Sequence, residues 1–276
     1  MSQHIGQNGE FGSPHLLQIG QSLTLTVFQE GCMRIQKYID KPWGEFKASQ
    51  KKKKISHIAL QVLSWIAQCR RSMGILELQH ALAVEEDSSA LNPRKMKDMR
   101  QIVGVCAGLV TIDKESDIIR LAHYTTQEYF EQNWTLWFPN ANRCIATISL
   151  TYLSYEQFSA KPAQSWEEYR QRQRDNCFYE YAAQYWGHHA REAYPEVKDL
   201  TARFLRGPAL VSAVQVLVAQ QFSFGIFNIP KGIMGLHIAA YFGLNEEVME
   251  FLQVTVCPDV AGSYGQTALH WAVRNR

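Results

Sequence analysis

Between residues 55 and 109, apolar side chains recur at intervals of three and four, which is the spacing of one face of a helix. Residues 55–69 predict a first amphipathic helix, and residues 75–84 predict a second after a polar turn. A polar loop then leads to Pro93, and because proline is favoured in a first helical turn, a third helix is predicted from there to about residue 109. The side chains expected to face inward are Ile55, Ile58, Ala59, Val62, Ile66, Cys69, Leu78, Ala81, Leu82, Val103, Cys106 and Ala107.

The pattern changes after Gly108, a residue at which a helix can close. Residues 109–112 and 118–123 are two short apolar runs that enclose the polar turn 113–117, so they predict two strands joined by one turn. Three helices followed by such a hairpin are the elements of a winged helix, which we place at residues 51–138. The fold class expected is therefore mainly α with a short β-wing.

His123, Thr125 and Glu128 mark the expected return from strand to helix. Thr125 stands three residues before Glu128, which is the spacing of a capping box, and this predicts a helix over residues 127–132. His123 is expected to pack or to form a hydrogen bond at the corner between the strand and that helix.

Helical periodicity continues after the wing, and we predict a helical connector over residues 139–225. Its predicted helical segments are residues 142–155, 165–191, 200–205 and 209–220. One of these segments carries four aromatic residues at intervals of one, three and four, and such a stripe is more typical of a core than of a cofactor site. These aromatic residues are Phe178, Tyr181, Tyr185 and Trp186.

The last part of the chain repeats itself. Leu236 and His237 recur as Leu269 and His270 after 33 residues, which is the period of ankyrin repeats. We therefore predict ankyrin repeats at residues 226–276, one complete and one truncated. Each histidine occupies the position at which an ankyrin imidazole bonds the backbone and ties a turn to its helix. Because such a unit buries its apolar face only against neighbouring units, these residues are expected to pack against the helical connector.

Composition narrows the class of protein. Apolar and charged content are those of a folded chain, and a formal net charge of +2 gives no general attraction to nucleic acid or to an anionic membrane. Six scattered cysteines without a CxxC pair predict reduced thiols in the core. The sequence contains neither a membrane-spanning run nor a signal peptide, so a cytoplasmic protein is expected. Residues 1–50 are expected to form a poorly ordered leader and the end of a helical linker.

The sequence offers no motif for catalysis. It contains neither a phosphate-binding GxxxxGK[ST] loop nor a GxSxG nucleophile elbow. His188 and His189 are adjacent on a predicted helix and diverge by about 100°, so they cannot both hold one metal ion without distant partners. A Cys–His nucleophile pair has no local signature either. We expect a protein that is not an enzyme and that takes no cofactor, metal or small-molecule substrate.

DNA binding is the alternative function. In winged helices that bind DNA the third helix enters the major groove, and here its first half carries Arg94, Lys95, Lys97 and Arg100. However, residues 101–110 offer only one polar side chain, Gln101, and the acidic wing at residues 113–117 would repel phosphates. Contacts with protein partners, through the wing domain and the repeats, are therefore favoured over nucleic acid.

Two stretches resemble a known family. CAGLVT at residues 106–111 and IIRLAHYTTQEYF at residues 118–130 are similar to the winged-helix domain that follows the NACHT ATPase in fungal STAND proteins, which is related to the winged helix of GPI inositol-deacylase. The resemblance extends over residues 52–276, and it implies a winged helix followed by a helical link to ankyrin repeats.

This resemblance also implies a function. The full-length relatives are NTP-driven signalling switches of non-self recognition, in which the winged helix packs against the ATPase and the repeats bind a ligand. The present chain resembles their middle part only. We expect a truncated relative or fragment that acts through protein contacts, or an adaptor that pairs with a NACHT or ankyrin protein.

Overall fold

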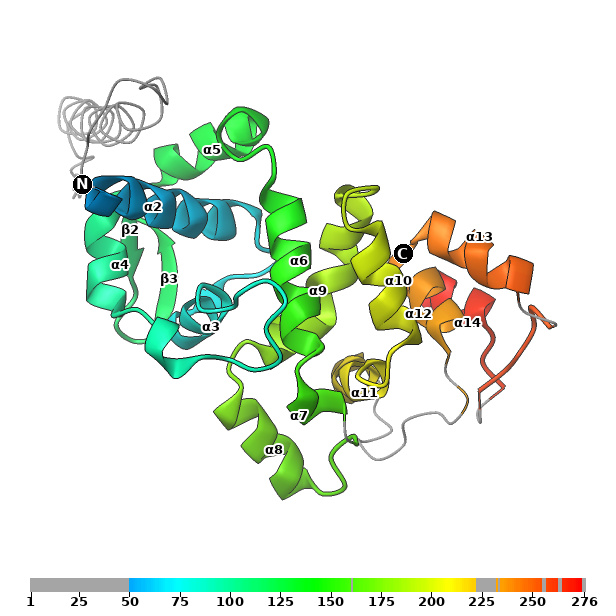
Figure 1. The fold of residues 1–276 in the computed structure, drawn as a ribbon. Helices are drawn as coiled ribbons and strands as arrows, with labels where there is room; N and C mark the ends of the chain where they lie inside the picture. Colours follow the sequence, from blue (N-terminus) through cyan, green and yellow to red (C-terminus); the bar gives the residue numbers. More distant parts are fainter. Residues whose placement is uncertain are drawn as a thin grey trace, which may run out of the picture.

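The computed structural model describes residues 50–159, 161–221, 232, 234–254, 257–262 and 265–274. The expected leader, apart from Gln50, and residues 226–231 of the expected repeat region lie outside these ranges. The described part is mainly helical, as the sequence pattern predicts, and it has three short strands where two were predicted (Figure 1).

The first helices lie close to their predicted positions. α2 (Gln50–Gln68) and α3 (Ile75–Ala81) correspond to the first two predicted helices. α2 buries Ala59, Val62, Leu63 and Trp65. Leu63 and Trp65 were not among the predicted inward residues, because the apolar face of α2 is broader than a single stripe.

The third predicted helix is wrong in its first half. Pro93 opens only a short 3-10 turn, η1 (Pro93–Lys95), which Asn92 caps by accepting a hydrogen bond from the backbone N–H of Arg94. The chain is then extended at Met96, and α4 (Met99–Val105) begins at a new cap, Asp98, whose carboxylate accepts from Arg100 N–H. Two caps six residues apart, Asn92 and Asp98, split what the apolar spacing predicts as one helix.

α4 ends at a reversal of the backbone. Ala107 and Gly108 both have positive φ, +53° and +82°, and the second value is one that glycine adopts without steric cost. The chain therefore turns sharply after Cys106 and enters the wing. The helix ends at Val105, earlier than the predicted end near residue 109, and Gly108 lies in the turn that leads into the wing.

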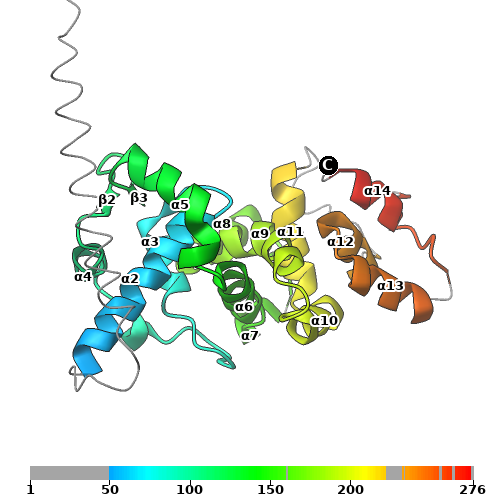
Figure 2. The same cartoon turned by 90° about the horizontal axis from the view of Figure 1, so that it is seen from above.

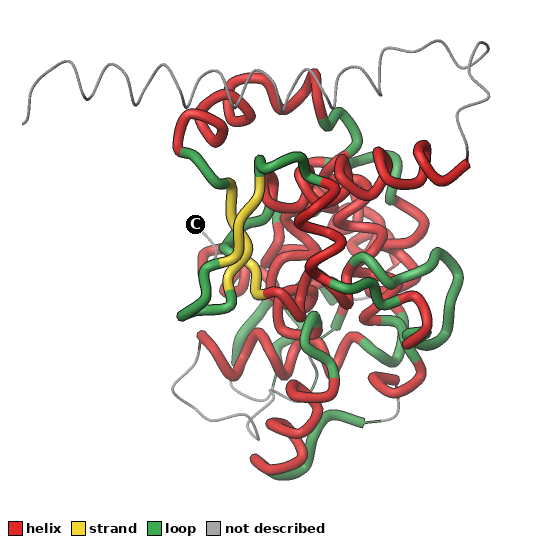
Figure 3. Tube along the Cα trace, turned by 90° about the vertical axis from the view of Figure 1, so that its left-hand side faces the viewer, coloured by secondary structure: helices red, strands yellow, loops and turns green. Residues whose placement is uncertain are grey.

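The wing is an antiparallel sheet in the order β1-β3-β2. Its strands are the yellow segments of Figure 3. β2 (Val110–Ile112) pairs with β3 (Ile118–Leu121), with Val110 opposite Leu121, so the predicted hairpin is confirmed. β1 (Met73–Gly74) was not predicted, because a strand of two residues has no periodicity of its own. Met73 lies opposite Ile119 and adds a third strand to the hairpin.

Seven helices continue the chain from the wing. They are α5 (Tyr124–Trp137), α6 (Ala141–Leu153), α7 (Glu156–Ser159), α8 (Trp166–Asp175), α9 (Tyr179–Glu192), α10 (Lys198–Arg206) and α11 (Leu210–Gln221). α5 lies beside α2, and α6, α9, α10 and α11 occupy the middle of the molecule in Figures 1 and 2. The segment predicted at 165–191 is two helices, because the chain leaves helical geometry at Asn176 between them. The described C-terminal residues form α12 (Gly235–Phe242), α13 (Asn245–Val254) and α14 (Ala268–Arg274).

One continuous hydrophobic core runs from α2 to α14. Trp65 of α2 packs edge-on against Phe178 and Tyr181, with ring centroids 5.5 and 5.9 Å apart. The predicted aromatic stripe is therefore core at Phe178, Tyr181 and Trp186, while Tyr185 is half-buried. The wing domain and the connector share this core instead of each enclosing one of its own.

The thiols are less uniform than expected. The five described cysteines are all free, but only Cys106 is buried, whereas Cys144 and Cys257 are exposed. The expectation of core thiols is wrong for these two residues: Cys144 lies on a solvent-exposed face of α6, and Cys257 lies in an exposed loop.

Candidate interaction sites

Five polar residues close a ring of hydrogen bonds between the end of α2 and helices α6 and α9. We call Arg70, Asn142, Tyr181, His189 and Glu192 the junction ring. The backbone N–H of Arg70 donates to the Tyr181 hydroxyl at 3.1 Å, and this hydroxyl lies 3.0 Å from Nε2 of His189. Nδ1 of His189 lies 2.7 Å from Oδ1 of Asn142, whose Nδ2 donates to Glu192 at 2.9 Å. An ion pair between Glu192 and the Arg70 guanidinium completes the ring.

The direction of each bond in the junction ring follows from its neighbours. Because Nδ2 of Asn142 donates to Glu192, its Oδ1 faces His189 and accepts, so Nδ1 of His189 carries the proton. Nε2 then accepts from the Tyr181 hydroxyl. Burial lowers the pKa of His189 to about 3 and raises the pKa of Tyr181 well above its usual range, so both groups are neutral at pH 7.

A second contact reinforces this junction. The Arg71 guanidinium donates two hydrogen bonds to the carboxylate of Glu77, at 2.8 and 2.6 Å, and lies 5.4 Å from the centroid of the Tyr181 ring. Glu77 also accepts from the backbone N–H of Gly74 at 2.8 Å. The turn after α2 is thereby tied to both the wing sheet and α9. Such a paired and partly buried set fixes relative position but leaves no group free for bond-making chemistry.

The adjacent histidines 188 and 189 have different surroundings. His188 packs edge-on against Phe242 of α12, with ring centroids 5.3 Å apart, and burial lowers its pKa to about 4. His189 lies in the junction ring. Among the described residues, no group of three or more His, Cys, Asp or Glu side chains is arranged to hold a metal ion.

The predicted capping box at Thr125 and Glu128 is wrong. α5 begins at Tyr124, and the cap is His123, whose backbone is extended and whose carbonyl accepts from the N–H groups of Thr126 and Gln127. Thr125 therefore lies within the helix, where its buried hydroxyl has no hydrogen-bond partner. The Glu128 carboxylate instead accepts from the Tyr124 hydroxyl at 2.7 Å. The helix also extends past residue 132, to Trp137, with a kink at Asn133.

The basic residues considered for DNA contact are partly engaged within the protein. Lys95 forms an ion pair with Glu85 at 2.7 Å, and the Nζ of Lys97 donates to the carbonyl of Leu82 at 3.4 Å. Arg94 and Arg100 are exposed, one before α4 and one in its first turn. In the wing, the Asp113 carboxylate accepts from two backbone N–H groups, which lowers its pKa and keeps this end of the hairpin negative.

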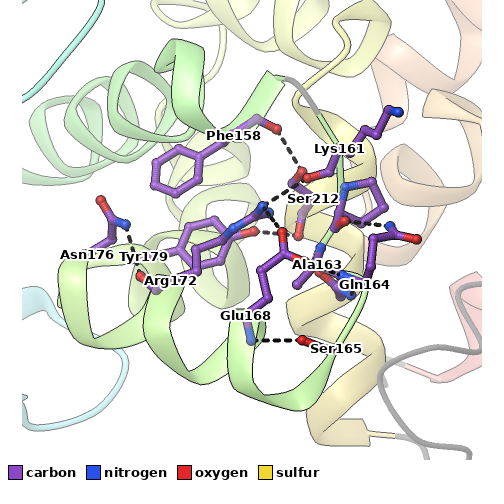
Figure 4. A network of polar contacts seen from close by, with 12 residues as sticks. Phe158, Lys161, Ala163, Gln164, Ser165, Glu168, Arg172, Asn176, Tyr179 and Ser212 are labelled. Atoms are coloured by element: carbon purple, nitrogen blue, oxygen red, sulfur yellow. Dashed lines mark hydrogen bonds and ion pairs between the residues drawn. The ribbon is translucent and has the colours of Figure 1, made fainter.

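A polar cleft of about 690 Å³ lies beside α7 and α8. Glu168 and Arg172 of its lining pair with each other at 3.4 Å, and Glu167 pairs with Arg174 at 2.7 Å. Figure 4 shows how residues 161–164, the segment before α8, are held in place. Arg172 donates a hydrogen bond to the carbonyl of Lys161 at 3.0 Å. The buried amide of Gln215 binds both backbone groups of Ala163, at 2.8 and 2.9 Å. Arg172 and Gln215 therefore hold residues 161–164 in place.

The C-terminal helices repeat one local geometry. Nδ1 of His237 accepts from the backbone N–H of Met234 at 3.2 Å, and Nδ1 of His270 accepts from that of Thr267 at the same distance. Nε2 of His237, which therefore carries the proton, lies 3.1 Å from the carbonyl of Val260 in the following loop. Leu236 is buried, whereas Leu269 is 73 % exposed.

Close packing fixes α12 on the connector. A Cβ at position 187 would overlap the ring of Phe242, and a Cβ at position 235 would lie 2.6 Å from the carbonyl oxygen of Leu205. Only glycine fits at either contact. The sequence analysis did not identify these two glycines, nor Asn142 and Glu192 of the junction ring, because their roles depend on residues far away in the chain.

Three helices with an antiparallel wing define the N-terminal part of the described chain as a winged helix. The family model described as GPI inositol-deacylase, winged helix domain, matches residues 46–136. No curated protein and no solved structure gives a significant match to this chain.

In the described residues no single helix is long and apolar enough to cross a membrane, and only α10 with α11, bent by 85°, pass such a test as a pair.

Proposed function

We propose that this chain is a non-catalytic, cytoplasmic protein-interaction module of the NACHT–ankyrin signalling type, with α12 to α14 as the first ankyrin repeats. It binds protein partners, not a small-molecule substrate, cofactor or metal. The single observation that carries the proposal is the apolar face of α14. Leu269 and Val273 are 73 % and 59 % exposed there, although Trp271 of the same helix is buried. An apolar face of this kind marks a surface made for contact.

The repeat geometry supports the ankyrin assignment. Leu236 and Leu269, like His237 and His270, are separated by the 33-residue period. Both imidazoles accept a hydrogen bond from the backbone N–H three residues earlier. The α12–α13 pair also closes through Gly243, whose φ of +68° is the left-handed conformation common after a helix.

The junction ring favours a rigid connection between the winged helix and the connector, as in a scaffold, and not a flexible hinge. Every member of the ring is bonded to its neighbours, and the aromatic core continues behind it. A partner that engages α14 is therefore held at a fixed position relative to the winged helix. In a larger signalling protein such rigidity would carry a movement of one end to the other.

A comparison of affinity-captured proteins tests this function. The wild-type chain, a Leu269→Asp/Val273→Asp variant and a Leu136→Asp control are each used as bait in extracts of the cells from which the chain comes. Leu136 is 76 % exposed on α5, far along the chain from α14. We expect a protein partner that the control retains and the double variant loses. Identical partners for all three baits, or turnover of a nucleotide by the purified chain, would contradict the proposal.

A further inference from the structure

The two edges of the wing sheet differ in their hydrogen bonding. The register of β1 and β3 turns the backbone groups of Ser72 and Gly74 away from β3. Side chains bond these outward groups: the Arg71 guanidinium donates to the Ser72 carbonyl at 3.0 Å, and Glu77 accepts from Gly74 N–H at 2.8 Å. The β1 edge is therefore closed to a further strand.

The β2 edge is open in the part of the chain that the structure describes. Leu109 and Asp113, which flank β2, each form a backbone hydrogen bond of 2.9 Å with the chain of β3. Because backbone groups alternate in direction along a strand, the N–H and C=O of Val110 and Ile112 point away from β3. Within the described ranges, these outward groups have no hydrogen-bond partner.

Only the Ile112 end of this edge is within reach of another chain. Val110 is 4 % exposed, whereas Ile112 is half-buried and the turn after it is exposed at residues 114–117. β2 contains no charged residue, proline or bulge, which are features that protect an edge strand from pairing. Free N–H and C=O groups at a strand edge are matched by an extended polypeptide, which adds a further strand to the sheet.

The charge of the turn beside this end selects the occupant. Residues 113–117 hold three carboxylates and one lysine. Asp113 is paired with Arg120 at 3.3 Å. Glu115 and Asp117 are exposed, and neither has an ion-pair partner among the described residues. A strand that runs past Ile112 and alongside this turn is therefore favoured by basic side chains.

A second copy of this chain does not fit this edge. Symmetric pairing of two β2 strands would have to use both Val110 and Ile112 of each copy, and Val110 is covered. Such pairing would also place each acidic turn beside residues 107–109 of the other copy, which carry no positive charge. A separate basic segment meets neither obstacle, because it pairs at Ile112 and continues along the turn.

We propose that the β2 edge of the wing binds an extended segment of a partner protein, which adds an antiparallel strand at Ile112 and places basic side chains beside the acidic turn at residues 113–117. This surface is separate from α14 and goes beyond the function proposed above. Ile112 exchanges two backbone hydrogen bonds with the segment, and Glu115 and Asp117 determine the end at which its basic residues lie.

The probe that tests this is a short, fluorescently labelled peptide in which lysines precede an alternation of valine and threonine. In an antiparallel pairing its lysines lie beside the turn. One control peptide has glutamates in place of the lysines, and a second has methyl groups on the backbone nitrogens that would face β2. Binding to the full chain is measured by anisotropy, and we expect either control to bind at least about tenfold more weakly than the probe.

Three variants of the full chain locate the binding. Ile112→Pro removes the outward N–H but leaves the bonds of Leu109 and Asp113 to β3 in place, so a loss of about tenfold is expected. Ile112→Val keeps this N–H and is the matched control, which should bind as the wild type does. Glu115→Gln/Asp117→Asn changes exposed residues only, and it should weaken binding of the lysine peptide and flatten its salt dependence.

Several results would overturn the proposal: no binding of the lysine peptide, equal binding of either control peptide, or equal binding by Ile112→Pro and Ile112→Val. Self-association of the chain that Ile112→Pro abolishes would assign the edge to a second copy and would also overturn it. The bait comparison above tests α14 through Leu269 and Val273, so the failure of one surface is distinguishable from the failure of the other.

Discussion

The imidazole of His189 and the side-chain amide of Asn142 meet in the core, with Nδ1 2.7 Å from Oδ1, and join two helices across 47 residues of sequence. Both side chains are buried, so neither group exchanges its partner for water without a cost. Because the amide nitrogen is committed to Glu192, the imidazole has one tautomer available. The pair therefore sets the arrangement of the junction ring.

Removing the amide tests the energetic role of the ring. Asn142→Ala leaves the Nδ1–H of His189 without an acceptor, and we expect the free energy of unfolding to fall by about 2 kcal/mol. Urea unfolding followed by tryptophan fluorescence measures this. Gln127→Ala, which removes an exposed bond to Glu131, is the control and should change stability by no more than about 0.5 kcal/mol. Equal effects of the two substitutions would mean that the ring is not a stabilising unit.

Acid should destabilise the protein through His189. The unfolded imidazole titrates near 6.5 and the folded one near about 3, so below pH 6.5 the unfolded chain binds a proton that the folded chain does not. The contribution of this group is complete above that pH, and is lost as the pH falls, with a slope of up to about 1.4 kcal/mol per pH unit. The slope ends near the folded pKa.

The matching measurement is urea unfolding at several values between about pH 4 and 7. His189→Gln cannot titrate and should show a flatter dependence than the wild type. His57→Gln replaces an exposed histidine and should leave the wild-type slope unchanged. The assignment to His189 is wrong if these two variants have the same slope.

A methyl group at position 187 should separate α12 from α9. Gly187→Ala overlaps the Phe242 ring, and we expect a loss of about 1–3 kcal/mol together with faster amide hydrogen exchange in α12. Gly104→Ala is the control, because a Cβ there meets nothing within 4 Å, and a helix gains about 0.5–1 kcal/mol from the change. Adding Phe242→Leu to Gly187→Ala should recover part of the loss, and a failure to do so would place the strain elsewhere.

Duplex DNA should bind weakly and with little dependence on the four basic residues before and within α4. We expect the variant with Arg94, Lys95, Lys97 and Arg100 all changed to Ala to show only a small loss of an affinity that is already weak, and a salt slope only slightly shallower than that of the wild type, since Lys95 and Lys97 are engaged within the protein and only the two arginines are free to meet phosphates. Fluorescence anisotropy with a labelled duplex at several salt concentrations measures both. A steep slope that the variant loses would favour the DNA-binding alternative.

Local periodicity was sufficient for the helices and the wing, but not for their ends. Leu78 and Ala81 face inward as their spacing predicts, and the hairpin 110–121 follows from two apolar runs around one turn. The ends depend on caps, and sequence spacing alone does not choose between competing caps. Thr125 has the spacing of a cap, yet the extended backbone of His123 starts the helix two residues earlier.

The junction ring could not be predicted from the sequence, for a different reason. Arg70 and Glu192 are separated by 122 residues, and neither lies in a motif. His189 was expected to have a structural role, but its partners are set by how α6 crosses α9. Only the repeat period, which relates His237 to His270 at a fixed distance, carried information about a site beyond its own helix.

The indole of Trp65 has a practical consequence for anyone who cuts this chain. It belongs to the segment that the winged-helix family model matches, yet its covering rings, Phe178 and Tyr181, come from well beyond residue 136. A clone trimmed to the matched segment would lose both of these rings and expose the face of the indole that they cover, so it would be prone to aggregate. The smallest piece worth expressing extends at least through α9.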